Sequence, residues 1–103
     1  MILPRILRPV ASDLVEAANR YDVDGYAGLG DRFEKEFYSA VDRLSYSSTS
    51  HPKIYGEYRR IWLRPFPYAL YYRIDGVTPI VALLVYGGRD PRQIQRLLRL
   101  RTT

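Results

Sequence analysis

The sequence predicts an α+β domain, in which a helical hairpin packs on one face of a mainly antiparallel sheet of about four strands. An N-terminal strand and a short C-terminal helix complete this expected fold. Two observations carry the prediction. Apolar residues recur at helical spacing up to Leu44. After a polar stretch, the second half alternates apolar and polar residues as strands do. The length, 103 residues, fits one domain covering residues 1–103.

The first two elements follow from proline and glycine positions. Residues 2–7 are largely apolar and contain Pro4, which suits an edge strand that joins the sheet. A first helix is expected to begin at Pro9, because the first helical N–H needs no partner within the helix. It should end at residues 22–24, just before Gly25.

A glycine-rich turn and a second helix come next. Residues 25–30 contain three glycines, but they lack the Lys-Ser/Thr of a phosphate-binding loop, so they predict a turn between helices. Asp31 and Glu34 have the spacing of a capping box at the start of the second helix. A polar loop is then expected at residues 45–52.

Three strands and a helix are predicted in the second half. The strand regions are 53–63 (residues 53–55 with 58–63), 68–74 and 80–86. Asp75-Gly76 is a turn signal between the second and third. Residues 80–86 are almost wholly apolar and predict a central strand buried on both faces. Asp90 and Pro91 can cap and open the last helix.

Composition restricts the classes of function. The absence of cysteine excludes disulfides and thiolate metal sites, and no metal or cofactor is implied. The chain shows neither a signal peptide nor an apolar stretch of membrane-spanning length, so we expect a cytoplasmic protein without a membrane partner.

Charge is distributed unevenly along the chain. Residues 1–50 hold six Lys/Arg and eight Asp/Glu, whereas residues 51–103 hold ten Lys/Arg and three Asp/Glu. This asymmetry indicates an anionic partner for the second half, either nucleic acid or an acidic protein segment. The alternative is an ordinary solvated basic face.

Five short motifs, taken in order, resemble the ParE/RelE superfamily, the toxins of type II toxin–antitoxin modules. They are Ala11-x-Asp13-Leu14 with Ala17-Ala18, Gly28-Leu29-Gly30-x-Arg32-Phe33, Arg59-Arg60, Phe66-Pro67-Tyr68 through Tyr71-Tyr72, and Arg89-Asp90-Pro91. The resemblance covers nearly the whole chain, and it implies a growth-inhibiting toxin that a cognate antitoxin with an acidic, partly disordered tail neutralises in a hetero-oligomer. Such modules are also linked to plasmid stabilisation.

The family resemblance leaves two targets open. ParE-like members poison DNA gyrase, and RelE-like members cleave mRNA on the ribosome. Tyr68 stands where the nuclease branch tends to show Arg, and Tyr86 stands where relatives often show His. These departures favour gyrase, with no confident catalytic residue. A reduced nuclease site of Tyr86 as acid, with Arg59, Arg60 and Arg89 around the phosphate, remains the alternative. His51, the one histidine, is expected to be a solvated loop residue.

Several side chains are candidates for binding a partner. Alternation along a strand places Trp62 on one face with Arg60 and Arg64. An exposed Trp between two Arg would suit a protein partner or a stacking base, and the alternative is burial of Trp62 beneath the helices. Arg59 and Arg60 should point to opposite faces, and pairing with Glu57 or Asp90 is a competing role.

The last helix and the strand before it supply the other candidates. Arg92, Arg96 and Arg99 form a basic stripe at i, i+4 and i+7, and Arg89 precedes them. The stripe is either a docking site for an acidic segment or a solvated face. Tyr68, Leu70 and Tyr72 share a face of their strand, where we expect core packing instead of a binding platform.

Overall fold

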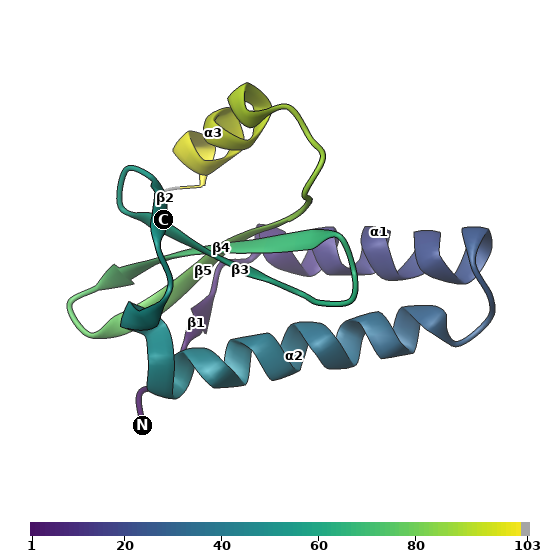
Figure 1. Cartoon of the computed structure of the whole chain (residues 1–103), viewed down its shortest axis with the longest axis horizontal. Helices are drawn as coiled ribbons and strands as arrows, with labels where there is room; N and C mark the ends of the chain where they lie inside the picture. Colours follow the sequence, from purple (N-terminus) through teal and green to yellow (C-terminus); the bar gives the residue numbers. More distant parts are fainter. Residues whose placement is uncertain (102–103) are drawn as a thin grey trace.

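The computed structural model describes residues 1–101. The elements are β1 (Arg5–Ile6), α1 (Pro9–Asp24), α2 (Leu29–Ser47), the short 3₁₀ helix η1 (Ser48–Ser50), β2 (Lys53–Tyr55), β3 (Tyr58–Trp62), β4 (Tyr68–Asp75), β5 (Thr78–Tyr86) and α3 (Pro91–Leu100). Figure 1 shows α1 and α2 together on one side of the sheet and α3 on the other. The predicted α+β class is confirmed.

The sheet has five strands in the order β1-β5-β4-β3-β2. All neighbours are antiparallel except β1 and β5, which are parallel. The prediction of about four strands was one too few, because residues 53–63 form a hairpin. Gly56 has a φ of +56°, which favours glycine, and it turns the chain between β2 and β3.

Aromatic rings fill the space between the helical hairpin and the sheet. Tyr21 of α1 and Phe33 of α2 meet Phe66 and Tyr68, with ring centroids 4.9–5.9 Å apart. Phe33 has no exposed surface. We call this side of the sheet the helical face.

The first helix has the predicted limits, but the second begins differently. α2 starts at Leu29, so Asp31 and Glu34 do not form the expected capping box. Asp22 of α1 supplies the cap instead: its Oδ1 accepts hydrogen bonds from the N–H groups of Gly28 (3.2 Å) and Gly30 (2.8 Å). Gly30 also allows the two helices to approach closely, since a Cβ there would lie 2.5 Å from the Ala18 carbonyl oxygen.

The polar loop predicted at 45–52 is shorter than expected. α2 continues to Ser47, whose hydroxyl donates to the Arg43 carbonyl one turn earlier (2.8 Å), and η1 follows directly. A serine can satisfy itself inside a helix in this way, so its polarity alone does not end the helix.

The two long strands form the middle of the fold. β5 lies between β1 and β4, and residues 79–85 are buried, which confirms the predicted central strand. Tyr68, Leu70 and Tyr72 of β4 are at most 7% exposed, so their expected role in the core is also confirmed. Of the first predicted strand, only Arg5 and Ile6 pair with β5, opposite Ile80 and Val81.

Candidate functional site

A surface rich in arginine covers the side of the sheet opposite the helical face. Strand register places Arg60 opposite Tyr71, and both Arg5 and Arg73 opposite Ile80. Residues opposite one another in a sheet share a face. The Tyr58 hydroxyl donates to the Leu98 carbonyl (3.4 Å), which ties this face to α3.

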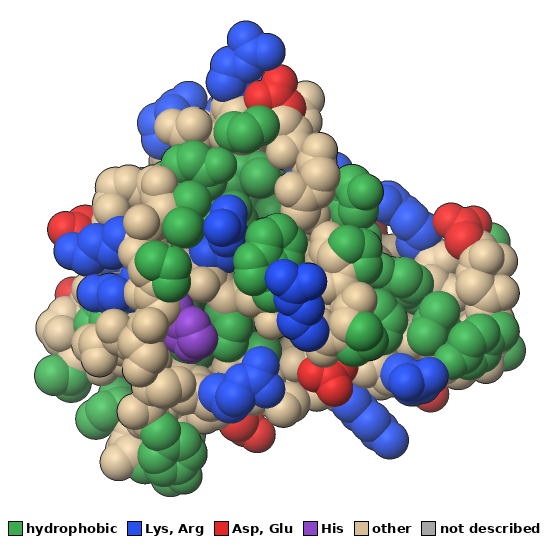
Figure 2. Space-filling model, in the orientation of Figure 1, with side chains coloured by type: hydrophobic (Ala, Val, Ile, Leu, Met, Phe, Trp, Pro, Cys, Tyr) green, Lys and Arg blue, Asp and Glu red, His purple; other side chains and the backbone are tan. Residues whose placement is uncertain are grey.

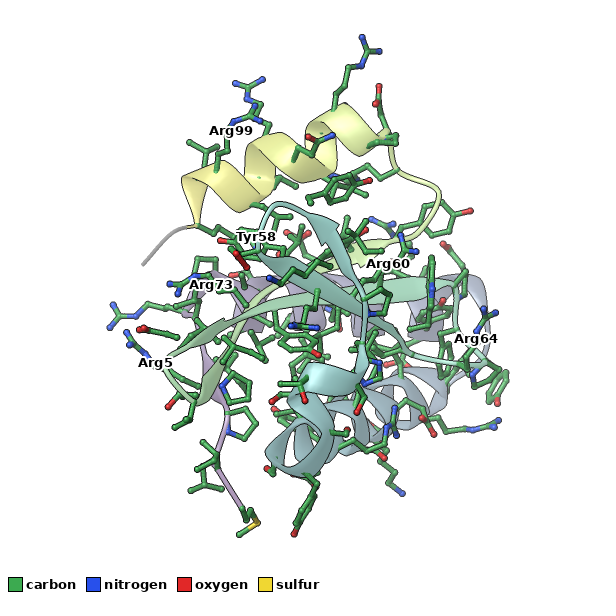
Figure 3. The ribbon with its side chains drawn as sticks, turned by 60° about the vertical axis from the view of Figure 1, so that its left-hand side comes forward. Arg5, Tyr58, Arg60, Arg64, Arg73 and Arg99 are labelled. Carbon is green, nitrogen blue, oxygen red and sulfur yellow. The ribbon has the colours of Figure 1, made fainter. Side chains whose placement is uncertain are left out.

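We define the basic sheet face by seven residues: Arg5, Tyr58, Arg60, Trp62, Arg64, Arg73 and Arg99. Figure 3 labels all of them except Trp62, which the guanidinium groups of Arg60 and Arg64 contact. Figure 3 shows Arg5 and Arg73 towards one side of the molecule, Arg60 and Arg64 towards the other, and Arg99 above them on α3. Figure 2 shows Lys and Arg side chains over α3 and across the middle of the molecule, with apolar side chains between them.

Trp62 is the aromatic centre of the basic sheet face. The guanidinium carbons of Arg60 and Arg64 lie 4.9 and 5.6 Å from its ring centroid, within the range of cation–π attraction. Trp62 is half-buried and packs against Gly87, where a Cβ would lie 2.4 Å from the ring. It therefore lies between two arginines, as alternation predicted, and not beneath the helices. The arrangement is a cationic surface whose aromatic ring and two guanidinium groups are already in contact.

Arg59 points the other way and has a structural role. Its guanidinium donates to the carbonyl oxygens of Thr49 (3.3 Å) and His51 (2.6 Å) and so holds the segment before β2. The suggested pairing of the two neighbouring arginines with Glu57 or Asp90 was wrong. Glu57 is paired with Lys53 (2.7 Å), and Asp90 is paired with Arg92 (3.1 Å).

The four residues of the alternative nuclease site do not come together. Tyr86 lies opposite Tyr68 in the sheet, with ring centroids 6.1 Å apart, so it is on the helical face. Arg60 is on the other face, and Arg59 is held by the two carbonyls. Tyr86 and Arg89 do share a groove, which is described below with Asp13.

Burial shifts the pKa values of three side chains of the sheet and of the segment before β2. Burial raises the pKa of Tyr72 to about 12, and Arg59 opposes this only in part. Burial also raises the pKa of Tyr71, against the effect of Arg60. For His51, burial and then the charges of Arg43 and Arg59 lower the pKa, so the imidazole is neutral at pH 7. His51 is half-buried and not the solvated loop residue expected, since its Nε2 lies in the interior without a hydrogen-bond partner.

The predicted arginine stripe on α3 is exposed to solvent. Arg92, Arg96 and Arg99 all have exposed side chains, while Ile94 and Leu98 of the same helix are buried. Asp90 caps the helix, as expected, by accepting from the Arg92 N–H (2.9 Å). Arg92 contacts Asp90 at an exposed position, so this ion pair contributes little to stability.

A partly buried ion pair was missed by the sequence analysis. Arg101 Nη1 and Nη2 donate to the two carboxylate oxygens of Asp13 at 2.5 and 2.9 Å. The side chains are 16% and 14% exposed. Asp13 also accepts from the Leu84 N–H (3.1 Å), and Arg101 donates to the Ala82 carbonyl (3.2 Å). The available signal was Asp13 itself, a charge in the apolar stripe of α1 three residues after Val10.

The pair lies in a groove of about 260 Å³ between α1, β5 and α3. The groove contains five charged side chains and several apolar ones. They include Asp13, Glu16, Arg20, Tyr86, Arg89, Leu97 and Arg101.

Two further observations concern ligands and membranes. Within residues 1–101, no group of three or more His, Cys, Asp or Glu side chains is arranged to hold a metal ion. In the same range, the helices are too short or too polar to cross a bilayer.

Comparison with known proteins shows the fold. No family model and no curated protein matches the sequence. Among solved structures, the chain is similar to one described as a chromosomal ParDE TA system from P. aeruginosa, with a TM-score of 0.74 and 17% sequence identity. The match covers 84% of this chain and 96% of that chain. The chain therefore has a ParE-like fold, as the resemblance in the sequence implied.

Proposed function

We propose that this chain is the toxin of a type II toxin–antitoxin module, and that it arrests growth by inhibiting DNA gyrase. A cognate antitoxin neutralises it in a cytoplasmic hetero-oligomer. The ParE-like fold supports the module class, because a solved structure with this fold is described as a ParDE TA system. The observation that favours gyrase over mRNA is the separation of Tyr86 from Arg60 on opposite faces of the sheet.

RNA cleavage through the 2′-hydroxyl needs an acid, a base and cations around one phosphate. Arg59 is committed to the carbonyl oxygens of Thr49 and His51, and Tyr86 projects on the helical face. Because the candidate acid and the candidate arginines do not surround one phosphate, the chain is better suited to act by binding a protein target than by cleaving RNA. Binding of a protein target needs only a well-packed surface.

The basic sheet face provides such a surface. Trp and Arg are the residues most often found at the energetic centre of protein interfaces. Trp62 is already held in place by Arg60, Arg64 and Gly87, so little side-chain freedom is lost when a partner arrives. We assign gyrase to the part of this surface formed by Arg60, Trp62 and Arg64, and the exposed stripe of Arg92, Arg96 and Arg99 to acidic residues of the antitoxin.

Inhibition of gyrase supercoiling by the purified chain tests the proposal. Arg64→Ala should weaken inhibition about tenfold, which corresponds to the loss of about 1.4 kcal/mol from one contributing interface residue, whereas Lys35→Ala on the outer surface of α2 should have no effect. Full growth arrest in cells without any inhibition of purified gyrase would reject the target.

Transcripts from the same cells separate the two modes of action. Intact transcripts during growth arrest are expected. Cleaved transcripts that disappear with Tyr86→Phe or Arg89→Ala would instead establish a ribosome-dependent mRNA endonuclease.

A further inference from the structure

The edges of the sheet are protected very unequally. β1 has two residues and follows Pro4, which cannot donate a hydrogen bond. β2 has three residues, begins with Lys53 after Pro52, and pairs irregularly with β3. Short strands, Pro, Lys and irregular pairing all discourage another chain from adding to an edge.

β5 is different, because it is the longest strand and only part of its outward edge is covered. β1 pairs with Ile80 and Val81, and Leu7 N–H donates to the Val81 carbonyl (2.9 Å). The chain then leaves the sheet to enter α1. From Ala82 to Tyr86, no strand within residues 1–101 lies along this edge of β5.

Two side chains occupy the place of the missing strand. Asp13 accepts from the Leu84 N–H, as a strand carbonyl would, and Arg101 donates to the Ala82 carbonyl, as a strand N–H would. The bidentate pairing of Arg101 with Asp13 holds both side chains in position. Unlike a backbone strand, these side chains can rotate away without unfolding the sheet.

The surrounding groove has the chemistry for an acidic extended segment. Apart from the Asp13–Arg101 pair, its charged side chains are the guanidiniums of Arg20 and Arg89 and the carboxylate of Glu16. Tyr86, 47% exposed, and the half-buried Leu97 offer apolar surface beside them. A strand added here would gain main-chain hydrogen bonds from β5 and side-chain selectivity from these walls.

We propose that the outward edge of β5 from Ala82 to Tyr86 is a strand-docking site for an extended acidic segment of the antitoxin, and that this segment displaces the Asp13–Arg101 pair from the backbone. The inference rests on the proposed function, since the partner is the antitoxin. In the free chain the pair covers the edge. In the complex, the backbone of the antitoxin takes over the bonds to Leu84 and Ala82.

This exchange predicts that the pair competes with the antitoxin. Removing both side chains together, in Asp13→Ala/Arg101→Ala, leaves the net charge unchanged and leaves the edge uncovered. The antitoxin should then bind about three- to tenfold more tightly, because it no longer has to displace one or two hydrogen bonds. Lys53→Ala/Glu57→Ala is the matched control, because it removes an exposed ion pair of the β2–β3 turn and should not change the affinity.

Hydrogen exchange at the Leu84 amide tests the location directly. The probe is the cognate antitoxin that the proposed function requires, co-expressed with this chain and purified as the complex. In the free double variant the Leu84 amide should exchange fast, and in the complex it should be protected again. In the control variant the amide should be protected in both states. Protection restored by the antitoxin would establish the strand at this edge.

The possible failures differ from one another. A stable complex in which the Leu84 amide of the double variant still exchanges fast would overturn the inference and leave the proposed function standing. Absence of any complex would overturn both. Protection that rises with the concentration of the double variant alone would mean that a second copy fills the edge, which overturns the assignment of the occupant.

A milder variant covers the case in which the double variant does not fold. Asp13→Asn keeps an oxygen that can accept from the Leu84 N–H but removes the charge that holds Arg101. The antitoxin should bind it more tightly than it binds the unchanged chain. Equal or weaker binding would overturn the competition.

Discussion

The two faces of the sheet use the same strands for opposite purposes. On the helical face, Phe33 and Tyr68 lie in a closed cluster of rings. On the basic sheet face, Trp62 is left half-buried and is held by the charged groups of Arg60 and Arg64. Because neighbouring residues of a strand point to opposite faces, stability and binding can be changed separately in this chain. Substitutions on the helical face should change mainly the free energy of unfolding, and truncation of exposed arginines on the basic sheet face should change mainly the proposed binding.

The largest effect is expected from Phe33→Ala. It removes the ring that contacts Tyr21, Phe66 and Tyr68 and leaves a cavity, so the free energy of unfolding should fall by about 3–5 kcal/mol in a urea titration. Tyr38→Ala on the exposed side of the same helix should cost about 0.5 kcal/mol. Similar losses for the two variants would show that the ring cluster is not what stabilises the helical face.

The second effect is a fall in the free energy of unfolding at alkaline pH, and it arises from Tyr72, which is buried on the helical face. Burial raises the pKa of Tyr72 from 10.0 to about 12, so the folded state holds this proton more tightly than the unfolded state does. The resulting stability is fully present below pH 10 and is lost as the pH rises from 10 to about 12. The loss should be at most about 3 kcal/mol.

Tyr72→Phe tests the source of the alkaline loss. Urea midpoints measured between pH 9 and 12 should fall less steeply for this variant than for the unchanged chain. Some dependence should remain, because the pKa of Tyr21 and that of Tyr71 are also raised by burial. An unchanged slope would show that Tyr72 is not the group responsible.

A smaller effect is expected from Gly87→Ala, which lies against Trp62 of the basic sheet face. The new Cβ would lie 2.4 Å from the Trp62 ring, which must move away from the sheet. We expect a loss of about 1–2 kcal/mol and a red shift in the emission of this single tryptophan. Gly88→Ala, whose Cβ would meet Tyr86 instead, should leave the emission unchanged.

The smallest change in stability is expected from Arg64→Ala. The side chain is exposed, and its contact with Trp62 should contribute at most about 1 kcal/mol. Its effect on gyrase inhibition should nevertheless be about tenfold. A loss above 2 kcal/mol in the urea titration would show that the basic sheet face supports the fold, contrary to the comparison of the faces.

Local patterns predicted most of the fold. Some sequence signals start or end an element within a few residues of themselves, among them Pro9, the glycines at 25–30 and Asp75-Gly76. The limits of α1 and the β4–β5 turn could therefore be predicted from the sequence. Alternation likewise placed Trp62 between Arg60 and Arg64. These features depend on the residue and its immediate neighbours.

Interactions between distant parts of the chain could not be predicted in the same way. Asp22 caps a helix that begins seven residues later, and Asp13 pairs with Arg101 near the other end of the chain. An acidic partner was one of the roles considered for Arg59, but main-chain carbonyls near its own strand are equally good acceptors. In each case the partner is chosen by tertiary packing, which periodicity does not contain.

The parallel pairing of β1 with β5 also determines when the molecule is complete during its synthesis. Ile80 of β5 lies between Arg5 and Arg73 in the sheet and pairs with both. Arg5 and Arg73 therefore reach the same face only when β5 is in place. The helical hairpin can form as soon as it leaves the ribosome, because its contacts are local. The first strand must wait for almost the last one. We therefore expect the basic sheet face to form only after β5 has been synthesised.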